Sequence, residues 1–193
     1  MLIKDKFNPI FLENFEINKN ISIKYKNFYD RYYIPNTLIY GGNGCGKYTF
    51  VTALLNSIYK INIKKTKITL RIDTKDYNLL SSNYHFEILL DKYNYNFNNL
   101  CELINNLTES KEVNSNCNIK IIIIRNISSC KNDLLFFLKN KIDNASNNYR
   151  FFLITDKISI IDNKFRGFFH YINIPYENKE VLTEFYKKNI KKF

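Results

Sequence analysis

Glycine and proline are both scarce in this sequence of 193 residues, which contains five glycines and three prolines. An average protein contains about 7% glycine, so five glycines are a clear shortage. The shortage of proline excludes a proline-rich linker protein, and a hydrophobic content of 45% with 16% aromatic residues excludes a disordered chain. The length suits a single domain or slightly more, so we expect a globular protein with a substantial core.

Paired cysteine motifs and long apolar runs are absent as well. The cysteines, Cys45, Cys101, Cys117 and Cys130, form no CxxC pair and are accompanied by only two histidines. The sequence therefore offers no ordinary zinc site, and its thiols are expected to be reduced. No run approaches the roughly 18 apolar residues of a membrane span, and the N-terminus lacks the apolar stretch of a signal peptide. We expect a soluble, intracellular protein that is neither secreted nor membrane-bound.

Positive charge exceeds negative charge by a wide margin. There are 29 lysines and arginines against 18 aspartates and glutamates, which gives a formal net charge of +11. This excess suits a partner rich in phosphate, such as nucleic acid, or an acidic membrane surface. Codon bias explains it equally well, because the chain also holds 30 asparagines and 28 isoleucines, which A+T-rich codons encode. Charge alone therefore does not choose between these explanations.

Short apolar runs alternate with longer segments of helical period along most of the chain. This pattern predicts an α/β fold in which a parallel β-sheet is flanked by helices. Strands are expected at residues 37–40, 67–73, 84–89, 119–124, 150–155 and 171–174, and helices at residues 21–33, 47–60, 97–107, 131–143 and 177–192. We expect an N-terminal segment, residues 1–33, that leads into a core, residues 34–193, with an exposed loop at residues 108–118.

Four of the five glycines lie within six consecutive positions, directly after the first predicted strand. Gly41, Gly46 and Lys47 match the pattern GxxxxGK in the strand, loop and helix context that this motif requires. Glycines let several backbone N–H groups point at one anion, the following helix adds its dipole, and Lys47 supplies a positive charge. The pattern predicts a phosphate-binding loop, so residues 34–193 are expected to be a P-loop nucleotide-binding core with ATP as its ligand. The predicted cofactor-binding residues are Gly41, Gly42, Asn43, Gly44, Cys45, Gly46, Lys47, Tyr48 and Thr49.

The groups that would use a bound nucleotide chemically are missing from their usual places. Tyr48 occupies the position at which a serine or threonine hydroxyl ligates Mg²⁺, and Thr49 comes one residue later. The apolar run at residues 121–124 is followed by Arg125 and Asn126 rather than by acidic residues that hold the metal. Three carboxylates near predicted strand ends are left unplaced: Asp73, Glu87 and Asp156. We therefore assign no catalytic and no metal-binding residue, expect weak ATP binding with Mg²⁺ held poorly, and expect no hydrolysis by this chain alone.

The chain resembles the clamp-loader branch of the AAA+ ATPases, and most closely the small subunits of replication factor C. Residues 34–49 are similar to that family's phosphate loop, in which a proline precedes an apolar strand. Residues 80–87 are similar to a segment of one particular small subunit, whose own nucleotide site is degenerate. Residues 120–138 resemble the metal-binding strand and the helix after it, and residues 150–156 resemble the sensor strand.

This resemblance implies a role in a ring of clamp-loader subunits. The expected partners are other clamp-loader subunits, a sliding clamp and DNA bound without sequence preference, in the nucleus or an equivalent DNA-containing compartment. Candidates for contacts with DNA phosphates are Lys64, Lys65 and Lys67, although a solvated face explains these lysines too. Phe168 takes the position of the family's arginine that reaches a neighbouring subunit, and Arg166 is the only arginine nearby. The resemblance covers about residues 34–176, so the family's lid and collar domains are expected to be largely absent.

Two other functions stay open at this point. A free-standing P-loop kinase or NTPase would need an acidic metal ligand and a lid that the sequence does not reveal. A degenerate interaction module would keep the loop as a packing element and would bind no nucleotide. His85 lies in the segment that resembles the family, residues 80–87, but as a lone histidine in a predicted strand we expect it to be a hydrogen-bonded structural histidine.

Overall fold

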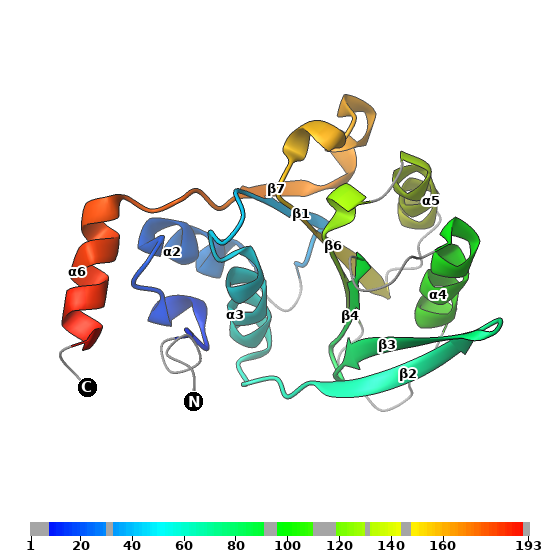
Figure 1. Ribbon diagram of the computed structural model, residues 1–193, viewed down its shortest axis with the longest axis horizontal. Coiled ribbons are helices and arrows are strands. Elements are labelled where there is room, and N and C mark those ends of the chain that lie inside the picture. Colours follow the sequence, from blue (N-terminus) through cyan, green and yellow to red (C-terminus); the bar gives the residue numbers. More distant parts are fainter. Residues whose placement is uncertain are drawn as a thin grey trace. The chain divides into compact units, whose positions relative to one another are not determined.

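The computed structural model describes residues 8–29, 33–90, 96–109, 119–129, 132–143 and 148–190. Figure 1 shows the course of the chain and labels its elements. The chain forms two compact units: the first contains Met1–Ile34, Gly41–Ile63 and Asn173–Phe193, and the second contains Pro35–Tyr40 and Lys64–Ile172. The predicted division after residue 33 stays a prediction. Within the described ranges, no helix combines the length and the apolar character that crossing a membrane requires.

A seven-stranded β-sheet is the main feature of the second unit. Its strands are β1 (Thr37–Tyr40), β2 (Thr66–Ile72), β3 (Lys75–Ser81), β4 (His85–Leu89), β5 (Lys120–Arg125), β6 (Tyr149–Thr155) and β7 (His170–Asn173). They lie in the order β2-β3-β4-β5-β6-β1-β7. The pairs β4 with β5, β5 with β6 and β6 with β1 are parallel, so the predicted α/β fold class is confirmed. The isoleucines of β5 are buried, as is typical of central parallel strands.

Two strands at one end of the sheet break the parallel pattern. β2 pairs with β3 in antiparallel register, from Thr66 opposite Ser81 onward, and β3 pairs with β4 in the same sense. The predicted parallel arrangement holds for β4, β5, β6 and β1, whereas β2 and β3 form an antiparallel edge that was not predicted, and β3 itself was missed. β3 alternates exposed polar with buried apolar residues, since Asn78 is exposed while Tyr77 and Leu79 are buried. A search for continuous apolar runs overlooks such an alternating strand.

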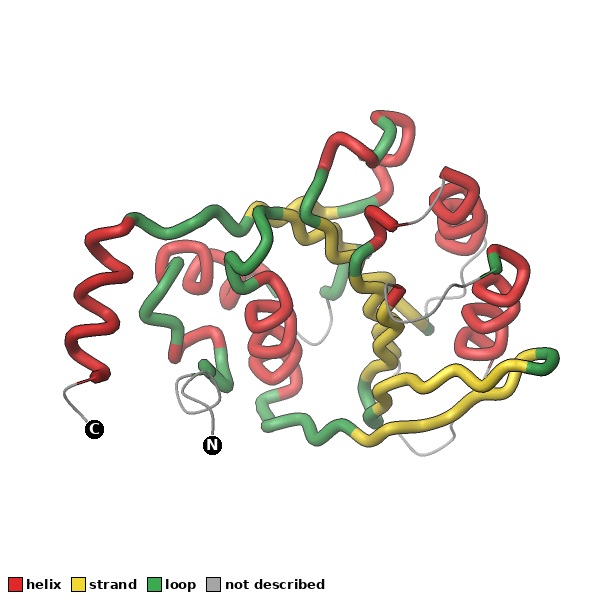
Figure 2. Tube along the Cα trace, in the orientation of Figure 1, coloured by secondary structure: helices red, strands yellow, loops and turns green. Residues whose placement is uncertain are grey.

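The helices α4 (Phe97–Glu109) and α5 (Asn132–Asp143) pack with the sheet around one core. Both lie on the same side of the sheet (Figure 1 and Figure 2). The core joins helical side chains to strand side chains, among them Leu103, Ile104, Leu134, Leu138, Ile122, Ile124 and Leu153. Short 3-10 turns, η3 (Ile127–Ser129), η4 (Ile158–Ile160) and η5 (Asn163–Phe168), follow β5 and β6. Residues 110–118 of the predicted loop lie outside the described residues, and Thr108 and Glu109 belong to α4 instead.

The described part of the first unit is helical. It contains η1 (Leu12–Asn14), α2 (Lys19–Phe28), α3 (Lys47–Tyr59) and α6 (Lys179–Ile190). Phe50 of α3 packs edge-on against Phe15 and against Tyr25, with ring centroids 6.0 Å apart in both pairs. The buried Asn56 donates from Nδ2 to the carbonyl oxygen of Ile10 at 2.8 Å. These contacts fix α3, the helix that follows the glycine loop.

Candidate functional site

The glycine loop connects β1 to α3 and belongs to the first unit. Three of its glycines have positive φ angles: 155° at Gly41, 79° at Gly44 and 91° at Gly46. A Cβ atom at Gly41 would overlap with the carbonyl oxygen of Ile174, whereas a Cβ at Gly44 or Gly46 would meet no heavy atom within 4 Å. Gly44 and Gly46 therefore allow the positive φ angles of the loop, and the space beside them is open. An open backbone is what anion binding by N–H groups requires.

Lys47, the first residue of α3, is bonded to the start of the loop. Its Nζ donates hydrogen bonds to the carbonyl oxygens of Gly41 and Gly42, both at 2.7 Å, and lies 3.9 Å from Cys45 Sγ. An ammonium group has three donors, so two of them tie the loop together and the third lies beside Cys45. The positive charge is thereby held at the N-terminus of a helix, where the helix dipole also favours an anion.

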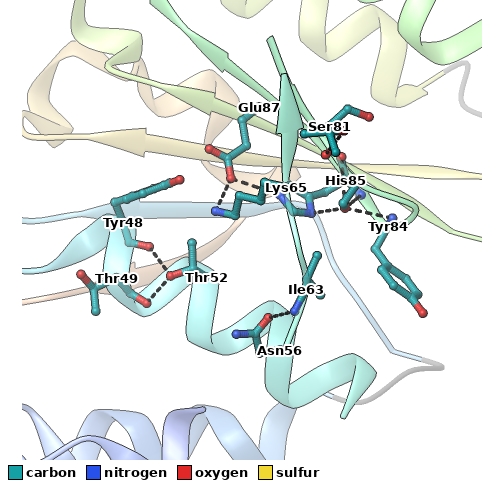
Figure 3. Close-up of polar contacts among 12 residues, drawn as sticks. Tyr48, Thr49, Thr52, Asn56, Ile63, Lys65, Ser81, Tyr84, His85 and Glu87 are labelled. Atoms are coloured by element: carbon teal, nitrogen blue, oxygen red, sulfur yellow. Dashed lines mark hydrogen bonds and ion pairs between the residues drawn. The ribbon is translucent and has the colours of Figure 1, made fainter. Parts of the chain in front are cut away.

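The first turn of α3 does not offer the hydroxyl that usually binds Mg²⁺. Tyr48 stands at that position and Thr49 follows it. The Thr52 hydroxyl, one turn later, is within hydrogen-bonding distance of the carbonyl oxygens of Tyr48 at 3.2 Å and Thr49 at 2.9 Å (Figure 3). That hydroxyl is thus used within the helix. The loop and Lys47 fit a phosphate group, but the residues after Lys47 do not fit Mg²⁺ bound by a hydroxyl in the ordinary way.

The carboxyl ends of the parallel strands form one edge of the sheet, and in open α/β sheets ligands bind at this edge. β1, which lies between β6 and β7, ends directly before the glycine loop. β5 ends at Arg125, in register with Ile154 of β6, and Asn126 follows with a φ of 59°. After β6, Asp156 accepts a hydrogen bond from the Ser128 hydroxyl at 2.9 Å. The end of β5 therefore carries a cation and an amide where a hydrolytic site has acids.

Glu87 on β4 is a buried carboxylate held by neighbours in the second unit. Its Oε1 lies 2.5 Å from Lys65 Nζ and 3.1 Å from His85 Nε2 (Figure 3). The other ring nitrogen of His85, Nδ1, lies 2.7 Å from Ser82 Oγ. Burial raises the pKa of the Glu87 carboxyl, but the hydrogen bond with His85 and the charge of Lys65 outweigh it and lower that pKa to about 2. Glu87 is thus ionised within a structural network, and the expectation for His85 is confirmed.

The acids that the sequence left unplaced do not provide a metal site. Asp73 is exposed between β2 and β3, Glu87 is bonded to Lys65 and His85, and Asp156 is bonded to Ser128. In the part of the chain that the structure describes, no group of three or more His, Cys, Asp or Glu side chains is arranged to hold a metal ion. The same network commits Lys65, one of the lysines considered for DNA contacts, to Glu87.

The position expected for the family's intersubunit arginine is filled by an aromatic side chain. Phe168 packs against the core of the second unit, and Lys139 Nζ lies over its ring at 5.1 Å from the centroid. Arg166 precedes it by two residues in the same 3-10 turn, η5.

Two contacts described here were not predicted from the sequence: the bond from Tyr176 to Asn43 and the ion pair of Lys65 with Glu87. Tyr176, far along the chain, donates from its hydroxyl to the carbonyl oxygen of Asn43 at 2.6 Å. No local pattern near Tyr176 indicates this contact. The pairing of Lys65 with Glu87 did have a signal, because Glu87 is followed by two apolar residues on a short strand, and a carboxylate that is buried there requires a partner.

The sheet and the loop together define a class: an α/β protein in which a glycine loop of the pattern GxxxxGK directly follows the first strand of a mostly parallel sheet. No protein-family model matches the chain. The chain is similar, however, to curated replication factor C small subunits. It is 26% identical to the probable replication factor C subunit 3 of Dictyostelium discoideum, over 95% of this chain and 56% of that protein.

Other relatives of the same kind come from fungi and animals. Replication factor C subunit 5 of Schizosaccharomyces pombe is 28% identical over 83% of this chain and 48% of its own length. Replication factor C subunit 3 of Homo sapiens is 23% identical over 80% of this chain and 46% of its own length. The resemblance to replication factor C small subunits is therefore confirmed. The chain spans about half the length of the curated relatives it matches.

Proposed function

We propose that this chain is a clamp-loader-like subunit that acts in DNA replication. Its similarity, over most of its length, to several replication factor C small subunits supports this function. In this role the chain assembles with other clamp-loader subunits, and the assembly acts on a sliding clamp and DNA. The site of action is then the nucleus or an equivalent DNA-containing compartment.

Within that role, we propose that residues 41–49 bind ATP weakly and that the chain does not hydrolyse ATP alone. The observation that carries this proposal is the contrast between Lys47, which is tied to the loop by two hydrogen bonds, and Arg125 with Asn126, which stand at the end of β5. Phosphate binding needs the loop and the lysine, whereas hydrolysis also needs a held metal and an oriented water.

Contacts with DNA would involve phosphates and no particular base sequence. Lys64 and Lys67 are exposed at the start of β2, and such lysines make salt-sensitive contacts with the phosphate backbone. Lys65 between them is bonded to Glu87 and is withdrawn from this role. We therefore expect a Lys64→Ala and Lys67→Ala double variant to weaken DNA binding by the assembly, and Lys65 not to contribute.

The proposed function is tested by co-expression of the tagged chain with clamp-loader-like subunits from the same source. We expect the chain to co-purify with them at fixed stoichiometry, measured by native mass spectrometry. A preparation of the same partners without this chain serves as the control. Partners that form a complete assembly while the chain elutes alone would rule out the clamp-loader role.

A degenerate interaction module is the second candidate function, and one observation favours it. The loop is held by contacts of its own, because Lys47 bonds the carbonyls of Gly41 and Gly42 and Tyr176 bonds that of Asn43. A loop stabilised in this way can serve as a packing element without a nucleotide. Isothermal titration calorimetry separates the two candidates, since ATP binding at micromolar affinity excludes the degenerate module.

A further inference from the structure

Residues 174–177, between β7 and α6, form a segment that lies against the phosphate loop and that we call the strap. The Tyr176 hydroxyl donates a hydrogen bond to the backbone carbonyl of Asn43 at 2.6 Å. The Tyr176 ring lies so close to Gly42 that a Cβ atom there would overlap with it. The strap therefore contacts the loop through two different parts of one side chain, its ring and its hydroxyl.

The backbone of the strap is itself held by other residues of the first unit. At its start, the carbonyl oxygen of Ile174 packs against Gly41. At its end, Glu177 Oε2 accepts a hydrogen bond from the backbone N–H of Asn18 at 2.7 Å, and Asn18 Nδ2 donates to the Pro175 carbonyl at 3.2 Å. These contacts fix the backbone of the strap on both sides of Tyr176. The backbone therefore holds the tyrosine side chain against the loop.

The strap covers the start of the loop and leaves the rest open. Lys47 and Tyr176 between them bond all the backbone carbonyls of residues 41–43. Gly44 and Gly46 lie next to the N-terminus of α3, the kind of position at which proteins bind phosphate, and have no heavy atom within 4 Å of a Cβ position. The contacts thus constrain one half of the loop while the phosphate-facing half remains accessible.

We propose that Tyr176 is a positioning residue of the phosphate loop. It holds residues 41–43 in the shape that directs the N–H groups of the following residues at a phosphate. The inference rests on the proposed function in that the phosphate is part of ATP. Its physical basis is pre-organisation: a glycine-rich loop has many conformations in the absence of constraints, and fixing one of them before binding raises affinity.

The exposure of Tyr176 argues that the contact serves the loop rather than the core. The side chain is 66% exposed, so its hydroxyl could be hydrated by solvent and has no need of a protein partner. Its removal leaves no buried cavity and no unsatisfied buried group on the tyrosine. A substitution at this position therefore changes the loop without unfolding the unit.

The test compares the full wild-type chain with its Tyr176→Phe and Tyr176→Ala variants. ATP affinity is measured by isothermal titration calorimetry, and hydrogen exchange of residues 41–46 is measured by mass spectrometry without nucleotide. Loss of one hydrogen bond predicts about five-fold weaker ATP binding and faster exchange of the loop for Tyr176→Phe. Tyr176→Ala also loses the ring contact and is expected to show about ten-fold weaker binding. Tyr186→Phe, in an exposed tyrosine of α6, is the matched control and should change neither quantity.

The two readouts separate failure of this inference from failure of the proposed function. Unchanged exchange and unchanged affinity in Tyr176→Phe would overturn the positioning role. Tighter ATP binding would also overturn it, because the strap would then obstruct the loop. Faster loop exchange in Tyr176→Phe, in a chain whose wild type binds no ATP, supports the positioning role and rejects ATP as the ligand.

Discussion

The glycine loop and the end of strand β5 differ in how closely they match a P-loop nucleotide site. The loop has its glycines and Lys47, whose ammonium is bonded to the carbonyls of Gly41 and Gly42. The end of β5 has Arg125 and Asn126, and no described group of acids compensates for them with a metal site. Phosphate recognition depends on main-chain shape, which several residues define together, whereas metal chemistry depends on single side chains.

The buried acid of β4 sharpens this contrast. Glu87 lies on a strand that pairs directly with β5, yet its carboxylate is bonded to Lys65 and His85. A carboxylate held by a cation in this way stabilises the sheet and is withdrawn from metal binding. Glu87 thus serves the stability of the second unit, and the predictions below test Glu87 and the glycine loop in turn.

The largest effect is expected for Glu87→Gln. The change removes a buried charge whose pKa is lowered from 4.5 to about 2, which corresponds to about 3 kcal/mol of unfolding free energy at pH 7. Urea unfolding of the two proteins measures this difference. Glu184→Gln, in an exposed glutamate of α6, is the control and should stay within about 0.5 kcal/mol of wild type.

The same pair of proteins gives a pH dependence with a definite sign. Because the folded-state pKa of Glu87 lies below its unfolded value, its contribution is complete above about pH 4.5 and is lost as the pH falls toward 2. The stability difference between wild type and Glu87→Gln should therefore fall to less than half between pH 7 and pH 3. A difference that stays constant over this range would mean that Glu87 is not held as an ion.

The next largest effect is expected for Lys47→Ala in the glycine loop, where the change should weaken ATP binding. The variant loses the two bonds that close the loop and the positive charge that we propose attracts a phosphate, so ATP binding should weaken by about 30-fold, or about 2 kcal/mol. Titration calorimetry measures the affinity. Lys187→Ala, in an exposed lysine of α6, should bind ATP like wild type. Equal weakening in both variants would show that general charge, not the loop, attracts the nucleotide.

A glycine pair tests whether loop shape carries the binding. A side chain at Gly41 would overlap with the Ile174 carbonyl, so Gly41→Ala should lower the unfolding free energy by about 1.5 kcal/mol and weaken ATP binding with it. Gly167 lies in open space in η5, and Gly167→Ala should stay within about 0.5 kcal/mol of wild type. The measurements are urea unfolding and ATP titration. An unaffected Gly41→Ala would show that the strap can move away from the loop.

What could be predicted from the sequence depends on how local each signal is. Strand β5 was predictable because its isoleucines are consecutive, and the loop because its glycines and Lys47 lie within one short motif. β3 was not, because polar residues such as Asn78 interrupt its apolar pattern and only its pairing with β2 and β4 makes it a strand. The bond from Tyr176 to Asn43 was not predictable either, since only the folded chain brings these distant residues together.

The smallest effect is expected for Tyr48→Ser. This change supplies the missing hydroxyl next to the glycine loop and leaves the end of β5 unchanged. A serine after Lys47 supplies the ligand that P-loops use for Mg²⁺, so Mg²⁺ should strengthen ATP binding about three-fold in the variant and not in wild type. Tyr48→Phe controls for the loss of the phenol. Turnover should stay absent in all three proteins, because Arg125 and Asn126 still stand where the acids of a hydrolytic site belong. Hydrolysis by Tyr48→Ser would show that one side chain, rather than two separate regions, divides this chain from an ATPase.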